Sequence, residues 1–158
     1  MALDTPPTEA EHQAAENNIV TFSYQKPTEF KRKKVTVRLA KTDLVRAMIQ
    51  VIKEGGENNL HYHSRVDGMF TVLNGRVRFY GPQNKLIGEF GKLEGVIIPR
   101  NARYWFESIG EDEAEVMLVQ GFHTIGSDLS GRTDIDPPKL PDAGKAAEWF
   151  TATQGKPM

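Results

Sequence analysis

Residues 55–75 read GGENNLHYHSRVDGMFTVLNG and hold two histidines one residue apart, His61 and His63. Side chains at positions i and i+2 of a β-strand point to the same face of a sheet. An HYH strand therefore presents two imidazoles side by side, and such a pair offers a transition metal two nitrogen ligands at once. Asn74-Gly75, between two apolar runs, is the strongest short-range signal for a β-hairpin.

Short runs rich in Val, Ile, Phe and Tyr continue on both sides of this stretch, and turn residues separate them. We expect strands at 19–24, 35–39, 46–53, 60–63, 69–73, 76–80, 86–90, 95–98, 104–108 and 115–122. No helix of ordinary length interrupts this region. The sequence therefore predicts an all-β sandwich or barrel rather than alternating βαβ units.

The 158 residues have the length of one domain, with room for a real core. Three parts are expected: an N-terminal extension at 1–18, a β-barrel domain at 19–123, and a C-terminal extension at 124–158 that packs on the barrel. Thr8 and Glu11 match the capping box of a short helix, although a flexible or loosely docked tail is favoured for 1–18. Residues 142–150 are expected to form a short helix that docks on the barrel.

Composition excludes several classes of function. A net charge of −1 gives no reason to expect nucleic acid or an anionic membrane as a partner. The absence of cysteine excludes disulfides, thiolate metal sites and cysteine nucleophiles. The chain shows no secretory signal and no apolar run that would span a bilayer, so a cytoplasmic location is expected.

One basic run stands out, Lys31-Arg32-Lys33-Lys34, directly before an expected strand. Charges at such a position keep a sheet edge soluble, which is the favoured interpretation. A specific anion site is the alternative.

The strand pattern and the histidine pair together resemble the cupin superfamily. In its first motif a glycine is followed by five residues and then by His-x-His, as Gly55 and His61-Tyr62-His63 are spaced here. Its second motif resembles Gly95–Ser108, with Asn101 at the turn glycine. The resemblance covers about residues 45–122 and implies a double-stranded β-helix, or jelly roll, with an antiparallel barrel. Because many cupins pair through exposed sheet edges, it also implies a homodimer.

Two usual metal ligands of that family are replaced in this chain. The slot for the glutamate falls on Gly68, and the slot for the last histidine falls on Tyr104. We expect His61 and His63 to bind a divalent metal, and Asp67 to supply a carboxylate if the strand bends or bulges at Asp67-Gly68. Tyr104 is expected to act as a ligand or acid/base group, or else to hydrogen-bond one of the histidines.

The resemblance also implies an interior pocket for a small organic ligand. By the two-residue period of a strand, Phe70 and Val72 share a face with Gly68, and Phe106 shares one with Tyr104. The expected pocket is aromatic and apolar. Arg100 is expected to meet a carboxylate at the barrel mouth. His123 is expected to be a rim or packing residue, and contact with the site is the alternative.

Three functions stay open. The first is a metal-dependent enzyme, dioxygenase-like or isomerase-like, using Fe, Mn, Ni or Zn on a small, partly apolar metabolite. The second is a non-enzymatic, metal-free domain that binds or senses a metabolite. The third is a structural or storage protein.

Overall fold

The computed structural model describes residues 5–54, 58–125, 129–135 and 147–155. One α-helix, one 3-10 turn and a series of strands make up the described part. In chain order they are α1 (Glu9–Glu16), β1 (Thr21–Ser23), β2 (Lys34–Lys41), β3 (Val45–Ile52), β4 (His61–His63), β5 (Val66–Asn74), β6 (Arg76–Tyr80), η1 (Pro82–Asn84), β7 (Leu86–Phe90), β8 (Gly95–Ile98), β9 (Trp105–Ile109), β10 (Ala114–Phe122), β11 (Arg132–Asp134), β12 (Ala147–Thr151) and β13 (Thr153–Gly155).

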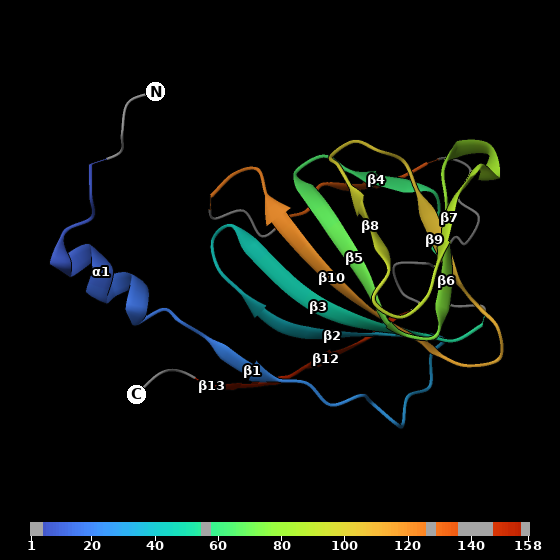
Figure 1. Cartoon of the computed structure of the whole chain (residues 1–158), viewed down its shortest axis with the longest axis horizontal. Helices are drawn as coiled ribbons and strands as arrows, with labels where there is room; N and C mark the ends of the chain where they lie inside the picture. The colour runs from blue at the N-terminus through green and yellow to red at the C-terminus, as the bar shows by residue number, and fades with distance from the viewer. Residues whose placement is uncertain (1–4, 55–57, 126–128, 136–146, 156–158) are drawn as a thin grey trace.

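Two layers of strands face each other (Figure 1). One is a six-stranded sheet in the order β12-β2-β3-β10-β5-β8. The other consists of a three-stranded sheet, β7-β6-β9, and the pair β11-β4. A two-stranded sheet, β1-β13, lies along the outside of the large sheet (Figure 1). The predicted all-β jelly roll is confirmed, although one pairing, β12 with β2, is parallel.

The core lies between the two layers and is aromatic at its centre. Phe70, Phe79 and Phe106 are each no more than 2% exposed. The rings of Phe79 and Phe106 stack at 4.7 Å, and Phe70 meets Phe106 edge-on at 5.3 Å. These contacts follow from the alternation of the strands, which directs every second side chain inward.

The outer face of the large sheet carries a second apolar cluster. Val35, Val51 and Leu39 are buried there, and Tyr24 and Phe30 of the N-terminal segment pack against that cluster. The segment that precedes β2 therefore covers part of the sheet on the side away from the core.

Asn74-Gly75 does not close a hairpin, and this prediction is wrong. β5, which ends at Asn74, pairs with β10 and β8, whereas β6 pairs with β7 and β9. Gly75 has a φ of +78°, and a side chain there would meet the carbonyl oxygen of Glu113 at 2.8 Å. The glycine makes the sharp turn by which the chain crosses from one sheet to the other.

Both termini differ in part from expectation. Residues 9–16 form the helix α1, whose capping box Thr8–Glu11 is complete and whose side chains are all exposed. The helix predicted at 142–150 is wrong for its last four residues, which belong to strand β12, and 142–146 lie outside the described residues. Within the described residues, no helix is long and apolar enough to cross a membrane.

The basic run does not mark a sheet edge either. β2 has neighbours on both sides, β3 and β12, because β12 adds to it in parallel. The last member of the run, Lys34, opens β2 directly opposite Ile52, a core residue. A solubilising role at an edge is therefore wrong for Lys34.

Gly95→Ala is expected to destabilise the protein. A Cβ at position 95 would lie 1.8 Å from the carbonyl oxygen of Phe70, which is backbone and cannot rotate away. Overpacking of this kind costs about 1–3 kcal/mol or more. Urea unfolding followed by circular dichroism measures the change, and Gly121→Ala, where a Cβ meets nothing within 4 Å, is the control. Equal stability of the two variants would contradict the close approach.

Candidate functional site: the histidine pair on β4

Strand β4 puts His61 and His63 on one face. Their ring centroids lie 5.1 Å apart, with the planes nearly perpendicular at 85°. His61 is 1% exposed and His63 is half-buried. The deeper ring thus faces the core, and the shallower one faces the open end of the barrel.

Two strands hold β4 in place from opposite sides. Tyr104, directly before β9, exchanges two backbone hydrogen bonds with His61: the His61 amide donates at 3.0 Å and the Tyr104 amide donates at 2.9 Å. On the other side β11 pairs in register, with Asp134 opposite His61 and Arg132 opposite His63. Residues directly opposite in a ladder point to the same face, so Arg132 and Asp134 flank the imidazoles.

A chain of hydrogen bonds orients His61. Its Nδ1–H donates to the carbonyl of Asn59 at 2.6 Å, an assignment made from this contact. The side-chain amide of Asn59 donates to Asp134 at 3.1 Å, and Arg132 donates to the other oxygen of Asp134 at 2.9 Å. With Nδ1 carrying the proton, Nε2 of His61 is left as an acceptor.

Both histidines are neutral at neutral pH. Burial, reinforced by the charge of Arg132, lowers the pKa of His61 to about 3. Burial and the charges of Arg132 and Arg46 lower the pKa of His63 to about 4, although Asp134 acts in the opposite direction. A second proton on either ring would put another positive charge beside guanidinium groups, in a poorly solvated site.

Tyr104 completes the group as a neutral phenol. Its ring lies 4.4 Å from that of His61, centroid to centroid, and it is only 3% exposed. Burial raises the pKa of Tyr104 well above its ordinary value. The hydroxyl therefore keeps its proton at neutral pH and is a hydrogen-bond donor rather than an anionic ligand.

A small pocket opens beside His63 at the barrel mouth. Its lining consists of His63, Val66, Gly68, Ile98, Pro99, Tyr104 and Gln120. The cavity measures about 10 Å³, which is close to the space that one water occupies. Nδ1 of His63 is buried and has no hydrogen-bond partner. An unpaired polar atom in such a place is costly unless a ligand or water meets it.

The structure does not bring Asp67 to the histidines. β5 alternates regularly, so Gly68 faces inward and Asp67 is exposed. The pairing of β5 with β10 shifts near Glu115 and not at Asp67, so the bend that ligation would need is not formed there. Instead Asp67 accepts a hydrogen bond from the backbone amide of Arg100 at 2.8 Å.

The other predicted residues divide between the rim and the core. Arg100 is exposed and contacts Nδ1 of His123, so both lie at the rim. Phe70, Val72 and Phe106 belong to the core cluster and are not among the residues that line the mouth pocket. Their role in binding a substrate stays a prediction.

Three residues of the site were missed in the sequence. Arg132 and Asp134 come from the C-terminal segment, where three residues, RTD, form β11 with no apolar alternation to mark a strand. Asn59 acts through its backbone carbonyl and its amide group, neither of which is part of a motif. Only the long-range pairing of β11 with β4 places them beside the histidines.

Comparison with known proteins decides the family. A family model described as Cupin matches residues 14–130. The chain belongs to the cupin family. No curated protein matches the sequence of this cupin.

Solved structures share the fold of this cupin at low sequence identity. The cupin domain of Cnp3 from Schizosaccharomyces pombe has a TM-score of 0.55 at 17% identity and covers 63% of this chain and 73% of its own. The polyketide cyclase RemF from Streptomyces resistomycificus has a TM-score of 0.54 at 17% identity, with coverage of 73% and 85%. An oxalate oxidase in complex with the substrate analogue glycolate has a TM-score of 0.54 at 17% identity, with coverage of 71% and 60%. At such identities the likeness shows the fold alone.

The donor set does not fit a resident transition metal. Catalytic sites normally supply three protein ligands, and here two imidazoles remain. Within the described ranges no three His, Cys, Asp or Glu side chains gather where they could hold an ion. Asp134 accepts hydrogen bonds from Arg132 and Asn59, and the charges of Arg132 and Arg46 reach the site. The Asp134 carboxylate is thus engaged by other donors, and a dication would also meet the positive charges of Arg132 and Arg46.

The unfolding free energy is expected to rise with pH between about 4 and 6.5. In this window the unfolded chain binds protons on His61 and His63, whereas the folded protein, with pKa values lowered to about 3 and 4, does not. The contribution of the two histidines to the unfolding free energy is fully present above about pH 6.5 and is lost as the pH falls toward their folded pKa values. Urea titrations across this range measure the slope. His61→Gln should lower the slope, because His63 alone then contributes; a slope equal to that of the wild type would contradict the argument.

Proposed function

We propose that this cupin binds a small organic acid beside His63, without a resident metal ion. The observation that carries the proposal is the register of β11, which pairs Arg132 with His63, a residue whose Nδ1 is buried and unpaired and whose pKa the charge of Arg132 lowers. A cationic group and a vacant hydrogen-bonding position together favour a carboxylate.

The polar groups around the mouth pocket suit an anion. The Tyr104 hydroxyl is protonated and can donate. The side-chain oxygen of Gln120 accepts from Arg46 at 3.0 and 2.5 Å, which leaves its amide nitrogen as a donor. His63 is neutral and offers one N–H in either tautomer. Donors in this number, with guanidinium charges behind them, stabilise a carboxylate and disfavour a metal ion.

Size and lining restrict the ligand further. A cavity of about 10 Å³, the space of one water, admits a single carboxylate oxygen, so the rest of the molecule would extend past the apolar wall formed by Val66, Ile98 and Pro99. An acid with one apolar part fits this arrangement. The oxalate oxidase that shares the fold holds glycolate, so a cupin shell accommodates a small carboxylate. The proposal is therefore a binding function, the second of the three considered from the sequence.

Benzoate is expected to bind in the pocket beside His63. Benzamide, its uncharged analogue of the same shape, is expected to bind at least about tenfold more weakly, because a hydrogen bond to a charged group contributes about 1.5–3 kcal/mol. Isothermal titration calorimetry with EDTA present measures both. Arg132→Gln should weaken the binding of benzoate by a similar factor. Arg76→Gln is the matched control, because Arg76 also pairs with a carboxylate, Glu89, but on the surface of the three-stranded sheet.

Two results would contradict the proposal. Equal affinity for benzoate and benzamide would show that charge is not recognised. Loss of binding in EDTA, restored by Mn²⁺ or Zn²⁺ in the wild type but not in His61→Ala/His63→Ala, would favour the metal site that the resemblance implies.

A further inference from the structure

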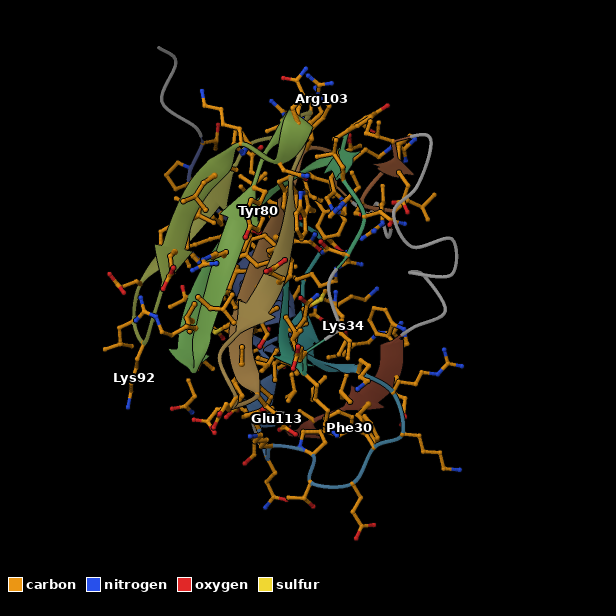
Figure 2. All side chains as sticks on the ribbon, turned by 90° about the vertical axis from the view of Figure 1, so that its right-hand side faces the viewer. Phe30, Lys34, Tyr80, Lys92, Arg103 and Glu113 are labelled. Atoms are coloured by element: carbon orange, nitrogen blue, oxygen red, sulfur yellow. The ribbon has the colours of Figure 1, made fainter. Side chains whose placement is uncertain are left out.

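The segment between β1 and β2 crosses the outer face of the large sheet, and we call residues 23–30 the strap. Both ends of the strap are fixed. Near its start, the Tyr24 hydroxyl donates to the buried carboxylate of Glu115 at 2.7 Å. At its end, Phe30 packs against the outer apolar cluster of the sheet, at the lower end of the molecule in Figure 2. These two contacts hold the strap in one position along the sheet.

A hollow of about 380 Å³ lies between the strap and the strand β12. Its floor is apolar. Phe150 of β12 lies in register with Val37 of β2, so both side chains point to the outer face, and Ala152 follows two residues later. Val37 is buried, whereas Phe150 is 40% exposed. Ligand pockets measure about 300–1,000 Å³, so an accessible aromatic ring here forms part of a floor that a small organic molecule can cover.

The walls of this hollow carry polar side chains that make no hydrogen bond or ion pair to another residue of the described ranges. They are three hydroxyls, an amide and a carboxylate, from Ser23, Thr28, Thr151, Gln25 and Glu29. Lys26, which also lines the hollow, is engaged by Glu113 and Glu115 at 3.1 and 3.9 Å. Five hydrogen-bonding groups are therefore available to a ligand around the ring of Phe150.

The charges around the hollow disfavour an ionic ligand. An anion would meet the carboxylate of Glu29. A cation would be attracted by Glu29, but Thr28 and Glu29 also border a neighbouring hollow that carries Lys31 and Arg32. Neither of these two cations forms an ion pair within the part of the chain that the structure describes, so both oppose that attraction. A polar ligand without net charge fits best.

We propose that the hollow under the strap binds a neutral saccharide. The ring carbons of a pyranose carry apolar C–H groups, which can pack on the ring of Phe150. Its hydroxyl groups both donate and accept hydrogen bonds, as do the hydroxyls and the amide of the walls, and the Glu29 carboxylate accepts from them. Because the strap is already held in place, little ordering is needed when the ligand binds. The site lies on the outer face of the sheet, and the proposal does not depend on acid binding beside His63.

Chemical-shift mapping by nuclear magnetic resonance tests the proposal on the full chain. Isotope-labelled protein is titrated with D-glucose, D-galactose and D-mannose. At least one hexose is expected to shift the amide signals of the strap and of residues 150–152. The affinity should be weak, in the millimolar range, because the sugar replaces bound water at exposed polar groups. Cyclohexanol, which has a ring of the same size but a single hydroxyl, should bind at least about tenfold more weakly.

Two variants of β12 form a matched pair. Phe150→Ala removes the ring from the floor and should weaken the binding of the hexose about fivefold. Trp149→Ala removes a larger exposed ring from the same strand. Trp149 lies on the opposite face of the sheet, in register with Thr36 and 4.8 Å from the guanidinium of Arg38, so its loss should leave the affinity unchanged.

A third variant tests the carboxylate. Glu29→Gln keeps the shape of the side chain but removes its charge, and it should weaken the binding of the hexose about threefold, because hydrogen bonds to a charged group are stronger than neutral ones. Tetramethylammonium chloride serves as the cationic probe and should shift the amides of the strap less than the hexose does.

Three results would overturn the proposal: no shift in the strap with any of the hexoses, equal binding of cyclohexanol, or stronger binding of tetramethylammonium. Equal losses in Phe150→Ala and Trp149→Ala would also contradict it, since the ring of Phe150 would then have no special role. The map of the wild-type protein locates the site by itself, so the test does not depend on whether the variants fold. Benzoate is scored separately, because its shifts are expected at His63 and Gly68 and not in the strap.

Discussion

The backbone pairing of His61 with Tyr104 is the constraint on which the rest of the site depends. Its two hydrogen bonds join β4 to the start of β9, and β4 in turn provides the edge on which β11 is built. One short strand of three residues therefore positions a phenol on one side and a guanidinium–carboxylate pair on the other. Because the positions of these groups are set by main-chain bonds, the geometry does not rely on flexible side chains.

Electrostatics then determines what this geometry can hold. Arg132 acts on His61, His63, Tyr104 and Lys34, and in each case its charge favours the form with fewer positive charges. A cupin that keeps a glutamate at the Gly68 position has an anion to balance a bound dication. In this chain that position is a glycine, and Arg132 and Arg46 bring positive charge to the imidazoles. The proposed preference of the pocket for an anion follows from this balance of charge.

Most of the fold could be predicted from the sequence, because local patterns determine it. The strands at 76–80, 86–90 and 95–98 were predicted to the residue, since alternation and turn residues bound them on both sides. Asn74-Gly75 misled because a tight turn has the same sequence whether its strands pair together or separate into two sheets. The strand β12 was missed because its partner, β2, lies more than a hundred residues earlier.

The candidate site could be predicted only in part, for the same reason. The spacing of His61 and His63 is a local property, and the structure places their rings side by side. Asp67 seemed a candidate by its distance along the chain, but a strand that does not bend sends it outward. Arg132 gains its importance from a strand pairing between distant segments, and nothing in the residues around it indicates a position beside the histidines.

The parallel addition of β12 also sets an order for biosynthesis. Until residues 147–151 leave the ribosome, β2 has one unpaired side, and its amide and carbonyl groups are open to any extended chain nearby. Apolar side chains such as Val35 and Val37 flank that open side. A nascent or prematurely terminated chain is for that reason a template for association between chains, and pairing with β12 ends this exposure.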